Sequence, residues 1–142
     1  MKKIVIFLLM ICSLYADSIS DIKAKIIENI AKTFTHKKVI KIYNQDPYFN
    51  DIFNANPNFK RVYTYRDADI ILTKDSSMFK NLPGNDKLPF IISTKYKDYK
   101  NNKDIDIGAF FWQKGRPNLI LNAKIIQENY IKIPKEYNKF LE

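Results

Sequence analysis

A short, unbroken apolar run within ADIILT, residues 68–73, constrains the fold of this chain more than any other feature. A run of this length and composition is typical of a strand that is buried on both faces of a sheet. Further strands are predicted at residues 39–43, 60–65 and 88–94, and helix-length segments separate them. Strands that alternate with helices favour an α/β domain with a largely parallel sheet.

The stretch GAFFWQKGRPNLILN, residues 108–122, predicts two further strands that form an antiparallel hairpin. Strand alternation puts Ala109 and Phe111 on one face, and Phe110 and Trp112 on the other. Apolar side chains on both faces indicate that most of the hairpin is core. The predicted fold class is therefore α/β: a single layered domain with a mostly parallel central sheet, flanking helices, and a C-terminal antiparallel hairpin followed by a helix.

Capping residues indicate where the helices begin. Ser18 or Ser20 is expected to cap a first helix that ends near Thr35, and Asp75 or Ser76 a short later one. The apolar face of the first helix recurs at spacings of three and four: Ile19, Ile22, Ile26, Ile30 and Phe34. Three other helix starts are predicted, at Asp46 followed by Pro47, at Asn122 and at Pro134. No regular element is predicted in the polar stretch 95–106.

The first sixteen residues, MKKIVIFLLMICSLYA, have the pattern of a secretory signal peptide. Lys2 and Lys3 precede a short apolar core, and Ala16 is the small residue at the expected cleavage site. Cys12 lacks the small residue expected just before a lipidated cysteine, so a lipoprotein is not expected. The predicted organisation is a signal peptide at 1–16 and a single α/β domain at 17–142, located in the periplasm.

The chain is strongly basic, with a formal net charge of +9 over 142 residues. A basic surface often indicates nucleic-acid binding. Export from the cytoplasm argues against nucleic acid here, and the lysines are spread along the chain rather than clustered. The expectation is a solvated basic surface, with weak attraction to anionic membranes or to an acidic partner.

Residues with catalytic or metal-binding chemistry are scarce, so the chain is not expected to be an enzyme or to hold a metal or cofactor. His36 is the sole histidine and Cys12 the sole cysteine. The three glycines cannot form a phosphate-binding GxGxxG or Walker loop. Two pairs of aspartates, Asp67 with Asp69 and Asp104 with Asp106, lack the spacing of a metal site. Asp104 and Asp106 are expected in a solvated loop.

Polar residues follow three of the predicted parallel strands. In open α/β sheets, ligands bind in the crevice beyond the carboxyl ends of the strands. The alternative function is therefore a small-molecule binding module, resembling one lobe of a periplasmic solute-binding protein. Its candidate ligand-binding residues are Asn44, Asp46, Thr73, Lys74, Ser93 and Thr94.

The order of segments resembles the YfiR-like family of small exported α/β proteins. The amphipathic helix IIENIAKTF precedes a strand and the turn NQDPYF, at residues 44–49. The strand ADIILT and the closing order of hairpin, Asn and helix, at residues 108–141, also match the family pattern. Family members often carry disulfides, whereas this chain has no cysteine after residue 16. Control through such bonds is therefore not expected here.

The resemblance implies a non-enzymatic regulator or sensor in the periplasm. It would bind and modulate a membrane-bound signalling protein such as a diguanylate cyclase or a sensor kinase, and dimerisation, common in the family, is a further expectation. Aromatic residues and arginine dominate the energetics of protein interfaces. The candidate partner-binding residues are therefore Trp112, Lys114, Arg116, Tyr96 and Tyr99.

Overall fold

The computed structural model describes residues 18–82 and 87–142, so the predicted signal peptide with Cys12, like Gly84, lies outside the described residues. The strands are β1 (Ile40–Asn44), β2 (Phe59–Arg61), β3 (Ile70–Thr73), β4 (Phe90–Ser93), β5 (Asp106–Gln113) and β6 (Arg116–Leu121). The α-helices are α2 (Ile19–Thr35), α3 (Ile52–Ala55), α4 (Tyr96–Asn101) and α5 (Ala123–Glu128). Short 3₁₀ helices are η1 (Pro47–Phe49), η2 (Tyr65–Asp67), η3 (Ser76–Phe79) and η4 (Lys135–Phe140).

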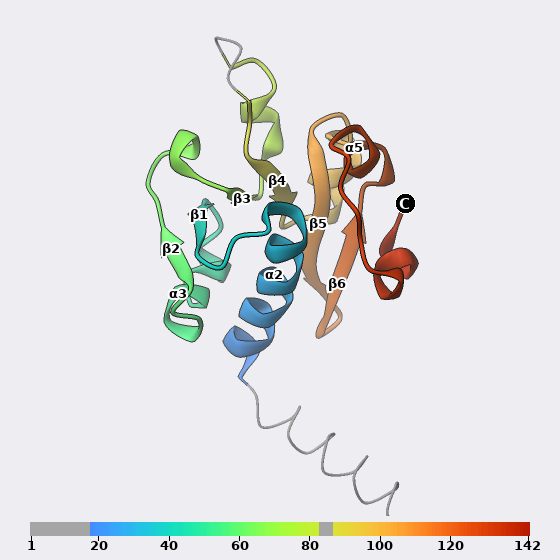
Figure 1. Cartoon of the computed structure of the whole chain (residues 1–142). Coiled ribbons are helices and arrows are strands. Elements are labelled where there is room, and N and C mark those ends of the chain that lie inside the picture. The colour runs from blue at the N-terminus through green and yellow to red at the C-terminus, as the bar shows by residue number, and fades with distance from the viewer. Residues whose placement is uncertain (1–17, 83–86) are drawn as a thin grey trace, which may run out of the picture.

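The six strands form one mixed sheet in the order β2-β1-β3-β4-β5-β6. The first five pair in parallel with their neighbours, and β6 runs antiparallel to β5. Helices lie against the sheet, with α2 in front of it in the view of Figure 1. This arrangement confirms the predicted fold class, including the closing hairpin and the helix that follows it.

Both faces of the sheet are buried, as the unbroken apolar run in β3 predicts. Ile70 and Leu72 join a core that includes the apolar face of α2. Ile71, which points the opposite way, packs in a second cluster with Phe79 and Ile91. The side chains of all three β3 isoleucine and leucine residues are fully buried. The alternation predicted for the hairpin is also confirmed, because Phe110 contacts the α2 core while Ala109 and Phe111 pack on the other face.

Helix α2 begins and ends where its capping residues predict. The Ser18 side chain accepts a hydrogen bond from the backbone N–H of Asp21. His36 adopts a left-handed conformation at the other end, with φ of 56°, and its N–H donates to the Lys32 carbonyl. The capping predictions for Asp46, Asp75 and Asn122 are confirmed by similar side-chain bonds, although the first two cap 3₁₀ helices rather than α-helices.

Two predictions of local structure are wrong. The strand expected at residues 60–65 is only Phe59–Arg61, because the pairing with β1 ends at Arg61 and the chain enters η2 at Tyr65. The polar stretch 95–106 contains α4 and the start of β5. Helix α4 presents one buried residue, Tyr99, to the sheet, and its other residues remain at least partly exposed.

The outer edge of β6 is partly covered by the last residues of the chain. Leu141 forms an isolated parallel bridge with Leu121. The backbone N–H of Glu142 donates to the Leu121 carbonyl, and the Ala123 N–H donates to the Glu142 carbonyl. The Glu142 side chain also pairs with Lys103, at 2.8 Å.

Candidate functional site

The β5–β6 hairpin extends beyond the strand that lies next to it in the sheet. The last pair between β4 and β5 is Ser93 with Ala109. Beyond Ala109, β5 continues to Gln113 paired only with β6. Figure 1 shows the end of this hairpin at the same end of the molecule as the start of α2. We call the segment Trp112–Arg116 the hairpin tip.

The turn at the hairpin tip is built from two consecutive residues with positive φ. Lys114 has φ of 54° and Gly115 has φ of 73°. Two consecutive residues with positive φ form a type I′ turn, whose twist matches that of the two strands it connects. Gln113 and Arg116 pair directly on either side of this turn. The side chains of Lys114 and Arg116 are exposed, and neither forms an ion pair with a described residue. The turn therefore presents two positive charges to solvent.

Trp112 forms the base of the hairpin tip. It is partly buried, with its ring edge-on to Phe110 and to Tyr48 at centroid distances of 5.9 and 6.3 Å. Tyr48 is itself held in place, because the Lys23 ammonium lies 3.8 Å from its ring centroid. The same ammonium donates to the Tyr48 carbonyl and to the Asp51 carboxylate. These contacts hold the buried side of the Trp112 ring in place, which lowers the entropy cost of binding through its exposed part.

Tyr96 and Tyr99 have different environments, although both lie in α4. Tyr96 is 45% exposed and packs against Phe111, on the face of the hairpin opposite Trp112. Tyr99 is 1% exposed, and its burial, with a smaller effect of Glu142, raises the pKa of its hydroxyl to about 12. The prediction that Tyr99 belongs to an exposed contact surface is therefore wrong, because the helix turns it onto the sheet.

The polar residues predicted at the strand ends do lie together, but they bond to one another. The Thr94 hydroxyl donates to Asp46 at 2.7 Å, and the second carboxylate oxygen of Asp46 accepts from the Tyr48 N–H. The Asn44 amide donates to the Asp46 carbonyl, and the Thr73 hydroxyl donates to the Gln45 side chain. Of the six predicted residues only Lys74 is exposed. The other five are buried: Asn44, Asp46, Thr73, Ser93 and Thr94. Most of their hydrogen-bonding capacity is used internally.

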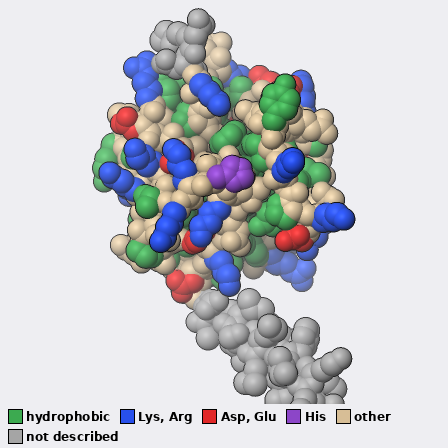
Figure 2. All heavy atoms as spheres, in the orientation of Figure 1, with side chains coloured by type: hydrophobic (Ala, Val, Ile, Leu, Met, Phe, Trp, Pro, Cys, Tyr) green, Lys and Arg blue, Asp and Glu red, His purple; other side chains and the backbone are tan. Residues whose placement is uncertain are grey.

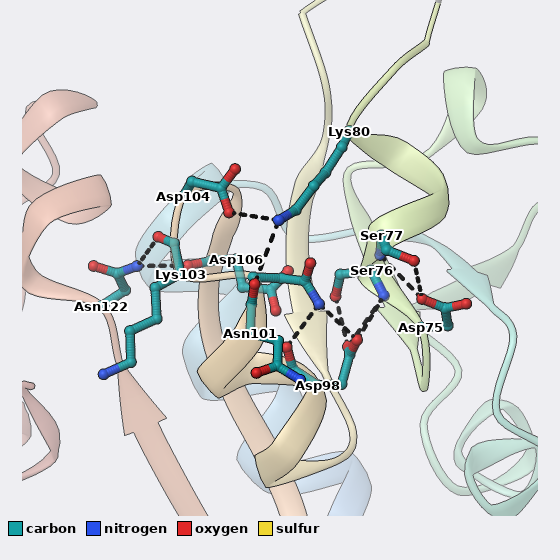
Figure 3. A network of polar contacts seen from close by, with 11 residues as sticks. Asp75, Ser76, Ser77, Lys80, Asp98, Asn101, Lys103, Asp104, Asp106 and Asn122 are labelled. Carbon is teal, nitrogen blue, oxygen red and sulfur yellow. Dashed lines mark hydrogen bonds and ion pairs between the residues drawn. The ribbon is translucent and has the colours of Figure 1, made fainter.

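A second polar network connects η3, β4 and α4, and Asp98 is at its centre (Figure 3). Its carboxylate accepts hydrogen bonds from the backbone N–H and the hydroxyl of Ser76. It also accepts from the Ser93 hydroxyl and from the Asn102 amide. The sequence pattern did not predict this network, since its members are separated by up to 26 residues and only the fold brings them together.

Asp106 lies beside this network, and its predicted position in a solvated loop is wrong. It is fully buried at the start of β5, and neither carboxylate oxygen has a hydrogen-bond partner among the described residues. Burial raises the pKa of this carboxyl to about 8; the neighbouring Ser76 side chain opposes this rise, and the negative charges of Asp98 and Asp104 add to it. Asp104 does lie in solvent, where it pairs with Lys80 at 3.1 Å and has a lowered pKa through that hydrogen bond.

A register irregularity determines which of the two buried faces of the sheet Asp106 occupies. Ile91 pairs with Asp106 but Ile92 pairs with Gly108, so Ile107 is an extra residue in β5. Such a bulge reverses the facing of the residues before it. Asp106 therefore shares the face of Ile91, which packs beneath η3. A lone polar residue immediately before the apolar run 107–112 was the one available signal in the sequence.

The described residues contain no group of three or more His, Cys, Asp or Glu side chains arranged to hold a metal ion. Within the same part of the chain, no helix is both long and apolar enough to cross a membrane. No protein-family model, no curated protein and no solved structure matches this chain.

Proposed function

We propose that the protein is a non-enzymatic periplasmic regulator that binds a membrane-bound signalling protein through the hairpin tip. The partner would be a protein such as a diguanylate cyclase or a sensor kinase, contacted on its periplasmic domain. The observation that carries this proposal is the hairpin tip itself, where two exposed cations lie beside a tryptophan whose ring packs on Tyr48 and Phe110.

The physical properties of the tip suit protein recognition. Tryptophan, tyrosine and arginine are the residues most often found to dominate binding energy. Trp112 and Arg116 are both at the tip, and the partly exposed rings of Tyr48 and Tyr96 flank the hairpin on its two faces. The positive charge favours an acidic patch on the partner, which would also speed the encounter.

Charge reversal at the tip tests the proposal without disturbing the core. The double variant Lys114→Glu with Arg116→Glu changes two exposed side chains, and Lys124→Glu with Lys132→Glu, at exposed positions outside the hairpin, is a control with the same change in net charge. The wild-type chain and the control, used as bait, are expected to retain the same inner-membrane signalling protein. The tip variant is expected to bind that protein at least roughly tenfold more weakly, as for loss of a hot-spot residue.

A second measurement connects binding to signalling. Deleting the gene is expected to change the cellular cyclic-di-GMP level or the output of the captured kinase, and the tip variant is expected to reproduce the deletion. Equal binding by the tip variant and the control would contradict the assignment of the tip. Failure to recover any signalling protein, with unchanged cyclic-di-GMP after deletion, would contradict the function itself.

A further inference from the structure

A cavity of about 250 Å³ lies between helix α2, the β5–β6 hairpin and η4. Figure 1 shows the C-terminal segment, in red, beside β6. Figure 2, in the same orientation, shows hydrophobic side chains that reach the surface among the lysines and arginines on the face where α2 lies. Packed protein interiors leave few voids larger than a water molecule. An apolar cavity of roughly 150 Å³ is already large enough to hold benzene.

The floor of the cavity is formed by α2 and the hairpin. Ile26 and Ile30 lie one turn apart on the apolar face of α2, and both line the cavity. Phe110 and Leu119 are directly opposite each other in the β5–β6 ladder. Pro117 lies two residues before Leu119 in β6, so it faces the same way. Since Ile30 and Phe110 are buried, the floor is continuous with the core of the domain.

The opposite wall is formed by η4. Tyr137 and Phe140 are three residues apart in this 3₁₀ helix, which puts them on the same side of it, and their ring centroids are 6.2 Å apart. Both rings are half-buried, so each has apolar surface left for a ligand to cover. The end of η4 is anchored, because Leu141 bridges to Leu121 and the Glu142 N–H donates to the Leu121 carbonyl. A wall that is already in place lowers the entropy cost of binding.

The polarity of the lining restricts the class of ligand. None of the described residues that line the cavity carries a charge. A charged group placed against them would lose its hydration without gaining an opposite charge. The lining does contain two polar groups, the Asn29 amide and the Tyr137 hydroxyl, and neither is hydrogen-bonded to another described residue. Each can donate to a ligand or accept from it.

We propose that this cavity binds a small uncharged organic molecule, in which an apolar body such as a ring with a short alkyl group carries one hydroxyl or carbonyl group. The apolar body would pack on Ile30 and Phe110 and be covered by the rings of Tyr137 and Phe140. The polar group would bond to Asn29 or to the Tyr137 hydroxyl. Apolar walls with few polar groups fix both the class and the orientation of such a ligand. Its binding requires no partner protein.

Calorimetric titration of the full chain with three related probes tests the ligand class. The uncharged probe para-propylphenol is expected to bind with one-to-one stoichiometry. Propylbenzene, which lacks the hydroxyl, is expected to bind roughly three- to tenfold more weakly, because one hydrogen bond is lost. The anion para-propylbenzoate is expected to bind no more tightly than the phenol. No saturable binding of the phenol, or at least roughly tenfold tighter binding of the anion, would overturn the proposal.

Two substitutions, each with a matched control, test the walls. Ile26→Trp fills the cavity from α2 and is expected to weaken phenol binding at least roughly tenfold, whereas Ile19→Trp, at an exposed position of the same helix outside the lining, is expected to leave it unchanged. Tyr137→Ala opens the η4 wall at a half-buried position and keeps the test decisive if Ile26→Trp fails to fold. It is expected to weaken binding by a similar factor, and Tyr130→Ala, which removes a 93% exposed ring, is its control. Affinity equal to that of the control in every folded variant would overturn the proposal.

Amide chemical shifts locate the bound phenol separately. Shifts are expected at Asn29, Leu119 and Phe140. A second cavity, of about 520 Å³, is lined by residues that include His36 and Asn129. Shifts confined to that second cavity would overturn the assignment of the ligand to the space beneath η4.

Discussion

The buried carboxyl of Asp106 gives the sharpest test of the structure. Its pKa is raised from an ordinary value of 3.8 to about 8, chiefly by burial, so the folded chain binds a proton that the unfolded chain releases. Between these two values, stability is greatest at low pH and falls as the pH rises. The slope is about −1.4 kcal/mol per pH unit, and at pH 7 the folded state has lost about 4 kcal/mol relative to its stability at low pH.

Asp106→Asn replaces the protonated carboxyl with a neutral side chain of the same shape. We expect it to be more stable than the wild type at neutral pH, by about 2 to 4 kcal/mol, where the lower value allows for imperfect bonding of the new amide hydrogens. We also expect the wild type to lose about 2.7 kcal/mol between about pH 5.5 and pH 7.5, and the variant to lose little. Urea unfolding followed by the fluorescence of Trp112, the sole tryptophan, measures both quantities.

Asp104→Asn is the matched control, because it removes an exposed carboxylate two residues away whose pKa is lowered rather than raised. The control is expected to keep the wild-type slope in this pH range. An Asp106→Asn variant that is less stable than the wild type at pH 7.5 and has the same slope would contradict a buried, protonated carboxyl at this position.

Three further substitutions test other parts of the structure by their effect on the free energy of unfolding. Gly108→Ala would place a Cβ atom 2.5 Å from the Ile120 carbonyl oxygen, so we expect a loss of at least about 2 kcal/mol or failure to fold; unchanged stability would contradict the pairing of β5 with β6. Gly115→Ala meets open space and has only the strain of φ at 73°, so a smaller loss of about 1 kcal/mol is expected in thermal unfolding. Asn122→Ala removes the cap of α5 and the two hydrogen bonds that its side-chain amide donates to the Lys103 and Asp106 carbonyls. A loss of about 2 to 3 kcal/mol is expected in urea titration, and a loss below about 0.5 kcal/mol would show that these hydrogen bonds do not form.

Local chemistry in the sequence was enough to predict the fold class and most helix starts. Ser18, Asp46, Asp75 and Asn122 all cap the elements expected of them, because a capping bond depends only on residues two or three positions away. The facing of the hairpin residues was also predicted, since alternation along a regular strand is a local property.

The wrong or missing predictions concern features that depend on contacts between distant parts of the chain. The burial of Asp106 depends on the pairing that makes it part of the sheet, and the face it occupies depends on the bulge at Ile107, which exists only through pairing with β4. The burial of Tyr99 depends on a helix of six residues, too short for a periodic pattern to identify, that packs on the sheet. At the candidate site, the sequence predicted the exposed cations of the tip, whereas the support of Trp112 by Tyr48 and Lys23 requires contacts across 25 or more residues.

The covered edge of β6 has a consequence for how this protein can associate. Pro117 has no N–H, and its pairing opposite Trp112 directs that missing donor away from β5. The last two residues occupy the Leu121 end of the same edge, and at the opposite edge β2 is three residues long with exposed Lys60 and Arg61. Neither edge of the sheet offers a long row of unpaired backbone N–H and C=O groups with which another strand could pair, which guards against polymerisation. Any specific partner must therefore recognise side chains rather than add a strand.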